Sequence, residues 1–133
     1  MNKPGTGNKK RQIKTRSVPK MYGEEYKLQW SIVQYLKYVL GNKFVWTSFP
    51  AGGGGRVRGA MLKKSGLVAG WPDLQIIKDG IYHGIEVKTD KGKVSDVQKD
   101  MHKNIIKNGG KVAICRSINE VEQALYDWTF FTK

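Results

Sequence analysis

The chain has 133 residues, with one cysteine, two histidines and a formal net charge of +13 at pH 7. This length suits one domain with a hydrophobic core of its own. A single cysteine, Cys115, excludes a disulfide framework, and two histidines are too few for a zinc cluster. The single cysteine fits a reducing, cytoplasmic location. The chain has no apolar run near the roughly 18 residues of a membrane span, so we expect no membrane association.

The positive charge is concentrated at the start of the chain. Residues 1–20 carry seven basic residues and no acid, whereas residues 21–133 carry seventeen basic against eleven acidic residues. We interpret 1–20 as a flexible basic arm and 21–133 as a single folded domain. A polyanion is the natural partner, and nucleic acid comes first. A tail that serves only solubility is the alternative, and the lack of an amphipathic pattern disfavours a membrane-surface arm.

A first helix is predicted over residues 24–40, where apolar residues recur at helical spacing before the stop signal Gly41-Asn42. Glu25 lies on or beside this apolar stripe. Its carboxylate is either a first-turn residue favoured by the helix dipole or a group directed inward. Periodicity alone favours the dipole.

A strand is predicted over residues 44–49, followed by Pro50-Ala51 and four glycines, 52–55. This run has neither a following Gly-Lys-Ser/Thr nor the G-x-G-x-x-G spacing, so it is not a phosphate-binding loop of those types. A short helix ending at Gly66 is expected next. It carries four basic residues that suit phosphate contacts or, equally, an ordinary exposed helix: Arg56, Arg58, Lys63 and Lys64.

A β-hairpin is predicted over residues 74–77 and 81–87, because Asp79-Gly80 is a strong signal for a two-residue turn. That turn places Asp73 opposite Glu86 on one face, and Lys88 shares the face two residues on. Two facing carboxylates repel unless a positive charge compensates, which Lys88 or a divalent cation would supply. The alternative is a solvated sheet face.

The remaining elements follow from capping and periodicity. A polar turn over residues 89–94 contains Lys91 and Lys93. Ser95 and Gln98 form a capping box that opens a helix. Its apolar face is expected to be Val97, Met101 and Ile105, and Asn108-Gly109-Gly110 ends it.

The chain then ends in a strand and a helix. The strand covers residues 111–115, and Ser117 with Glu120 predicts a second capping box. The inward residues of this last helix are expected to be Val121, Ala124, Leu125 and Trp128. Trp128, Phe130 and Phe131 either close the core or form an apolar patch for a partner. The order α-β-(α)-β-β-α-β-α predicts an α/β fold with a mixed sheet flanked by helices.

Pro72-Asp73 followed by Glu86-Val87-Lys88 resembles the motif of the PD-(D/E)xK nuclease superfamily. The whole ordered set is similar to a stand-alone VRR-NUC domain, a branch allied to Holliday junction resolvases. The matching features run from about Glu25 to Leu125: Glu25 with Gln29, residues 64–74, residues 85–88, Gly92, Ser95, Gln98 and a glycine before the last strand.

This resemblance implies a restriction-endonuclease-like fold and divalent-metal hydrolysis of phosphodiesters. It implies that Asp73 and Glu86 bind Mg²⁺ or Mn²⁺ with the Val87 carbonyl. Glu25 would be a third carboxylate, directly or through water, which favours the inward orientation. Lys88 would position the attacking water and stabilise charge on the phosphate, and Gln98 would orient the site.

The expected substrate is structured DNA, such as junctions or branches, and this geometry rests on the resemblance. Symmetric cutting of two strands calls for a homodimer. Two alternatives stay open. One is a nucleic-acid-binding module without catalysis, and the other is a nuclease for plain duplex or RNA, which composition does not separate from the first.

Overall fold

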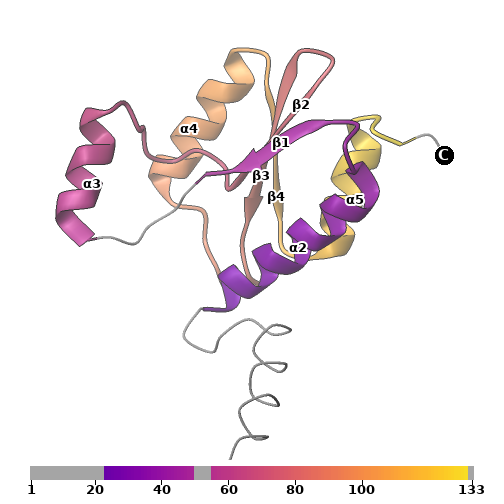
Figure 1. Ribbon diagram of the computed structural model, residues 1–133, viewed down its shortest axis with the longest axis horizontal. Coiled ribbons are helices and arrows are strands. Elements are labelled where there is room, and N and C mark those ends of the chain that lie inside the picture. Colours follow the sequence, from indigo (N-terminus) through magenta and orange to yellow (C-terminus); the bar gives the residue numbers. More distant parts are fainter. Residues whose placement is uncertain (1–22, 50–54, 132–133) are drawn as a thin grey trace, which may run out of the picture.

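The computed structural model of the protein describes residues 23–49 and 55–131. The predicted basic arm and residues 50–54 of the glycine-rich segment lie outside these residues. The described elements follow the predicted order (Figure 1): α2 (Glu24–Leu40), β1 (Val45–Ser48), α3 (Gly55–Lys64), β2 (Leu74–Lys78), β3 (Ile81–Val87), α4 (Asp96–Lys107), β4 (Lys111–Cys115) and α5 (Ile118–Asp127).

The strands form one mixed sheet in the order β1-β2-β3-β4. β1, β2 and β3 pair antiparallel, whereas β4 runs parallel to β3. A parallel pair needs a long crossover, and α4 supplies it between β3 and β4. The predicted α/β class with a mixed sheet flanked by helices is confirmed.

The central hairpin has the predicted register, with Lys78 opposite Ile81 and Ile77 opposite Tyr82. Asp79 and Gly80 form the two-residue turn with φ values of 54° and 75°. Both residues therefore occupy the left-handed region that a type I′ turn requires. The turn fixes which residues of β3 face which residues of β2.

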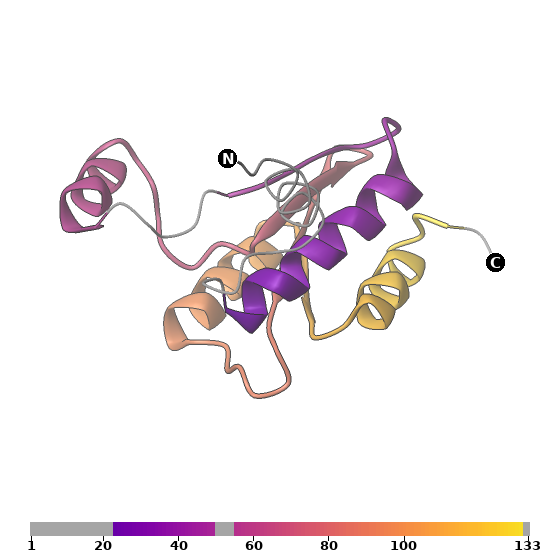
Figure 2. The same ribbon diagram turned by 60° about the horizontal axis from the view of Figure 1, so that its bottom comes forward.

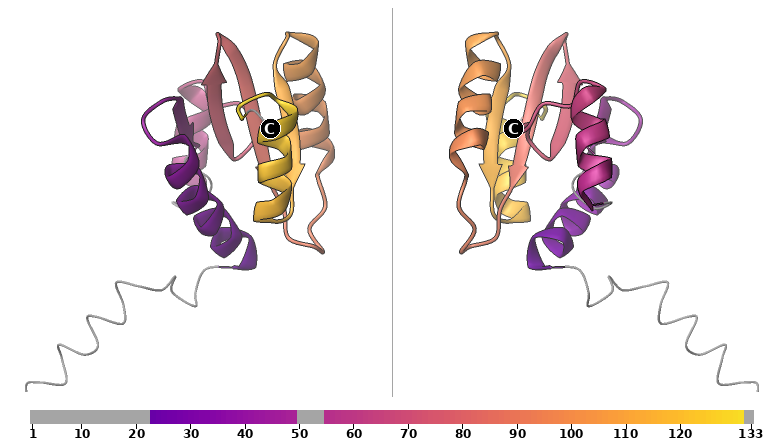
Figure 3. Two further views of the ribbon diagram at one scale, coloured as in Figure 1. Left: turned by 90° about the vertical axis from the view of Figure 1, so that its right-hand side faces the viewer. Right: turned by 90° about the vertical axis from the view of Figure 1, so that its left-hand side faces the viewer.

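One face of the hairpin is apolar and forms the core. Leu74, Ile76, Ile85 and Val87 are fully buried there against α2 and α5. α2 contributes a stripe at every fourth residue, because its buried positions are Ile32, Leu36 and Leu40. Figure 3 shows α2 and α5 on one side of the sheet and α4 on the other.

The aromatic C-terminus closes this core. Trp128, Phe130 and Phe131 are partly buried and pack against the core cluster. The ring of Phe130 lies 5.0 Å from that of Phe44, a tilted aromatic contact. Of the two predicted roles, core closure is the one that this packing supports.

Two local predictions are wrong. Val97 is 55% exposed, and the buried positions of α4 are Ile105, as predicted, and His102, which was not predicted. The first turn of α4 approaches Gly70 through its backbone, because a Cβ on Gly70 would lie 2.7 Å from the Val97 carbonyl oxygen. This approach does not require the Val97 side chain to be buried.

The second capping box is only half formed. The Ser117 hydroxyl accepts a hydrogen bond from the backbone N–H of Glu120 at 3.2 Å, as predicted. The Glu120 carboxylate does not return to Ser117, because it accepts from the backbone N–H of Arg116 at 2.7 Å. Of the helices in residues 23–49 and 55–131, none is both long and apolar enough to cross a membrane.

Candidate active site

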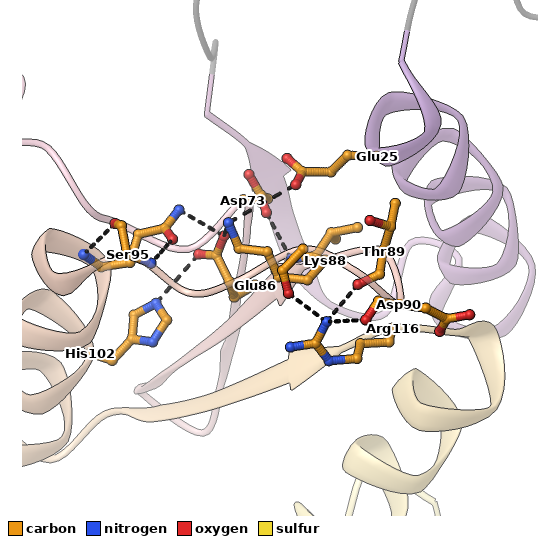
Figure 4. Close-up of polar contacts among 12 residues, drawn as sticks. Glu25, Asp73, Glu86, Lys88, Thr89, Asp90, Ser95, His102 and Arg116 are labelled. Atoms are coloured by element: carbon orange, nitrogen blue, oxygen red, sulfur yellow. Dashed lines mark hydrogen bonds and ion pairs between the residues drawn. The ribbon is translucent and has the colours of Figure 1, made fainter.

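The hairpin register brings Asp73 and Glu86 together. Leu74 pairs with Ile85, so the next position outward sets Asp73 against Glu86. The backbone N–H of Val87 donates a 2.7 Å hydrogen bond to Oδ2 of Asp73, which ties the start of β2 to the end of β3. The predicted pair of carboxyl groups therefore lies on one face of the sheet (Figure 4).

Glu86 is the most enclosed ionisable group of this cluster, with 1% of its surface exposed. Burial raises the pKa of Glu86 to about 8, and the adjacent Asp73 carboxylate, in hydrogen-bonding contact, adds to the rise. Burial penalises the charged form of an acid, and a neighbouring negative charge does the same. At neutral pH the pair therefore retains a proton.

Lys88 lies beside this pair and is itself 8% exposed. Its Nζ is 3.7 Å from Oε2 of Glu86 and 4.0 Å from Oε1 of Glu25. One ammonium thus faces two carboxylates from different elements. The lysine is placed where the sequence predicted, on the same face as Glu86.

Glu25 belongs to the first turn of α2, where a negative charge complements the helix dipole. Its side chain is about half exposed and points toward Lys88 (Figure 4). The two predicted roles for this carboxylate are therefore compatible. The N-terminus of α2 brings a third acidic side chain to the edge of the site.

Gln98 connects α4 to the site. Its Oε1 accepts from the backbone N–H of Ser95 at 2.9 Å, which completes the predicted capping box. Its Nε2 donates to Oε2 of Glu86 at 3.0 Å. The same amide therefore caps the helix and holds the carboxylate, so the two predicted roles coexist.

His102 is a site residue that the sequence analysis missed. Its Nε2 lies 3.3 Å from Oε1 of Glu86, and the ring is buried. Burial lowers the pKa of His102, which favours a neutral ring. The signal was present in the sequence, because His102 stands four residues after Gln98 and hence on the same helix face.

Arg116 is the second residue that sequence reasoning missed. Its Nη1 donates to the carbonyl oxygens of Thr89 at 2.5 Å and Gly92 at 2.7 Å, and more weakly to that of Asp90 at 3.4 Å. These bonds fix the loop that follows Lys88 (Figure 4). A cleft of about 540 Å³ lies beside this loop, lined by residues that include Lys27, Lys91 and Arg116.

No three side chains among His, Cys, Asp and Glu converge on one point in the part of the chain that the structure describes. Asp73 and Glu86 are the two carboxyl groups in direct contact, and Glu25 reaches Lys88 instead. Metal binding by Glu25, Asp73, Glu86 and the Val87 carbonyl stays a prediction.

The predicted nucleic-acid-binding residues are exposed and divide into two groups. Lys91 and Lys93 lie in the loop just after Lys88. The other group lies on α3, which has no buried residue and stands away from the sheet (Figures 1 and 2). Its members are Arg56, Arg58, Lys63 and Lys64.

Comparisons with known proteins give a consistent family. The model of the VRR-NUC domain family matches residues 14–119, which is most of the chain. A solved structure of a "VRR_NUC domain protein" superposes with a TM-score of 0.63 at 20% sequence identity, covering 82% of this chain and 90% of that one. At this identity the likeness establishes the fold alone. No curated protein matches the sequence.

Proposed function

The chain belongs to the VRR-NUC family, a nuclease domain family, and from this membership and the site geometry we propose that it is a divalent-metal-dependent endonuclease acting on DNA. The observation that carries the proposal is the contact between the Asp73 and Glu86 carboxyl groups, with Lys88 3.7 Å from Glu86. Paired acids with one adjacent amine suit phosphodiester hydrolysis.

The residues present fit a hard divalent cation. The Asp73–Glu86 pair keeps a proton at neutral pH because burial disfavours the charged form of Glu86 and the neighbouring Asp73 charge adds to the effect. A cation that displaced this proton would supply the missing charge. Mg²⁺ characteristically uses one or two carboxylates and keeps several waters or substrate oxygens. Two direct carboxylates are therefore sufficient, and we assign Glu25 to a water-mediated contact.

Each residue then has a defined task. When bound, Mg²⁺ or Mn²⁺ lowers the pKa of a water and neutralises charge on the phosphate. Asp73 is held by the Val87 N–H, and Glu86 is held by Gln98. The Lys88 ammonium, placed between Glu86 and Glu25, orients the attacking water and stabilises negative charge that develops on the phosphate.

Branched DNA is the substrate class that we propose within this activity, with two copies of the chain cutting opposite strands. A two-fold axis would place two identical sites on symmetric strands of a junction. The exposed basic residues of α3 and of the loop after Lys88 are suited to contact the backbone on either side of a cut. We also propose a cytoplasmic location, where the single cysteine stays reduced.

The test uses labelled four-way junction, flap, duplex and single-stranded DNA, with Mg²⁺, with Mn²⁺ and with EDTA. Asp73→Asn is the matched variant, because asparagine still accepts from the Val87 N–H but carries no charge. We expect ion-dependent cleavage by the parent and a loss of roughly 10²–10³-fold or more in the variant, with DNA binding retained.

The other outcomes separate the alternatives. Tight DNA binding by the parent without cleavage in any ion would identify a binding module. Equal cleavage by parent and Asp73→Asn would show that a contaminating enzyme does the chemistry. Symmetric nicks on the junction, together with a dimer in sedimentation at working concentration, would support the junction assignment. A monomer that prefers plain duplex would refute it.

A further inference from the structure

The two oxygens of the Glu86 carboxyl group have separate partners from α4. Oε2 accepts from Nε2 of Gln98 at 3.0 Å and faces Nζ of Lys88 at 3.7 Å. Oε1 lies 3.3 Å from Nε2 of His102. Figure 4 shows the imidazole and the Ser95–Gln98 cap approaching the carboxyl group from the same helix. One carboxyl group is thus held at both of its oxygens.

The place of His102 in the fold argues against a packing role alone. The ring is 7% exposed. Burying an imidazole costs desolvation that an aliphatic side chain would avoid, unless its nitrogen is hydrogen-bonded. Ile105, three residues on, fills the neighbouring buried position of α4 with a purely apolar side chain. The polar ring of His102 lies within hydrogen-bonding distance of Glu86.

We propose that His102 is a positioning residue, whose Nε2–H donates to Oε1 of Glu86 and fixes the orientation in which this carboxylate binds the divalent cation. This rests on the proposed function. The terminal torsion of a glutamate is soft, so a carboxylate held at one oxygen only can rotate. Some residues hydrogen-bond a metal ligand without touching the metal. Their removal typically changes metal affinity or activity by 10–100-fold.

The experiment compares His102→Leu with His102→Gln. Leucine fills the site without a donor, whereas the amide nitrogen of glutamine reaches about as far as Nε2 of histidine. Ile105→Val on the same buried helix face is the control for lost packing. Mg²⁺ and Mn²⁺ binding is measured by calorimetry without DNA, cleavage is followed in single turnover, and thermal unfolding reports folding. Long-range ¹H–¹⁵N spectra of the parent at saturating Mg²⁺ identify the His102 tautomer.

We expect ion affinity to fall about 10–100-fold in His102→Leu, to be largely restored in His102→Gln, and to be unchanged in Ile105→Val. We also expect a proton on Nε2. A proton on Nδ1 alone, or equal ion affinity in the parent and His102→Leu, would overturn the assignment. So would a glutamine variant no better than the leucine variant. Failure of the proposed function looks different, because the parent itself would then bind neither ion and cut no DNA.

Discussion

The site on the central hairpin and helix α3 are built in opposite ways. At the hairpin, Glu86 and Lys88 are buried, and side chains of α4 and α2 contact them, Gln98 at Glu86 and Glu25 at Lys88. α3 has four basic residues, no acid in its first turn and no buried residue. Figures 1 and 2 show it displaced from the sheet.

This contrast indicates how binding and chemistry are divided. Acidic groups on a DNA-facing surface repel phosphate, so the hairpin alone is a poor binding surface without a cation. Exposed basic side chains attract phosphate but do not hold reacting atoms within fractions of an ångström. We therefore expect that variants in the two regions affect different measurements.

The largest effect is expected for Lys88→Ala. The variant removes the ammonium that faces both Glu86 and Glu25. We expect the single-turnover cleavage rate to fall roughly 10²–10³-fold, while DNA affinity stays within about twofold. Lys91→Ala, in the exposed loop three residues on, is the control and should retain the rate at saturating DNA. An equal loss of cleavage rate and DNA affinity in Lys88→Ala would contradict the division of binding and chemistry between the two regions.

Glu86→Gln should change how stability depends on pH in the metal-free protein. The folded-state pKa of Glu86 is raised from 4.5 to about 8, so the folded chain keeps a proton there that the unfolded chain has lost. Stability therefore falls as pH rises through about 4.5 to 8 and is lowest above that window. The Glu86→Gln variant carries a neutral amide there, so its stability lacks this dependence on pH.

Thermal unfolding in EDTA checks this prediction. We expect the melting temperature of Glu86→Gln to exceed that of the parent by several degrees at pH 9, and the difference to vanish toward pH 5. Asp100→Asn, an exposed acid on α4, should show the parent's pH profile. Identical profiles for the parent and Glu86→Gln would mean that Glu86 ionises normally.

A matched pair of Gly→Ala variants compares packing in the two regions. A Cβ on Gly84 would lie 2.6 Å from Cγ of Pro72, next to Asp73, whereas a Cβ on Gly59 in α3 meets nothing within 4 Å. We expect Gly84→Ala to lower the free energy of unfolding by about 1–3 kcal/mol. Gly59→Ala should stabilise α3 by up to about 1 kcal/mol, because alanine favours helix.

Denaturant unfolding, with cleavage and ion affinity alongside, measures this pair. Gly84→Ala should also weaken ion binding, since Pro72 must shift and Asp73 follows it directly. If Gly84→Ala were as stable as the parent, the close contact between β3 and Pro72 would be looser than described. A strongly destabilised Gly59→Ala would mean that α3 packs against something in solution.

The smallest effect is expected from neutralising pairs of charges on α3. Arg56→Gln/Arg58→Gln and Lys63→Gln/Lys64→Gln should each reduce DNA affinity about tenfold or less. Each lost phosphate contact should lower the slope of log affinity against log salt by about 0.9 on duplex DNA. The rate at saturating DNA should not change.

Lys37→Gln/Lys43→Gln, at the far end of α2 from Glu25, is the control and should keep both the affinity and the slope. Fluorescence anisotropy at several salt concentrations gives both quantities. An equal loss in the control would mean that net charge alone, and not the position of α3, governs DNA binding.

Local chemistry predicted much of the fold and part of the site. The Asp79-Gly80 turn fixed the hairpin register because both residues accept positive φ, and this register alone placed Asp73 against Glu86. The Ser95–Gln98 box set the start of α4 because capping is a contact between residues three apart. These interactions are short in sequence, so the sequence contains all of their determinants.

Tertiary structure decided which face of α4 is buried and which distant groups meet. The sequence predicted Val97 as buried, but α4 turns His102 inward to Glu86, sixteen residues away along the chain. The Glu120 carboxylate accepts from the Arg116 N–H and not from the Ser117 N–H, and the Arg116 side chain secures the loop after Lys88. A period of 3.6 residues defines a stripe but not its neighbour, because the neighbour is chosen by how whole elements pack.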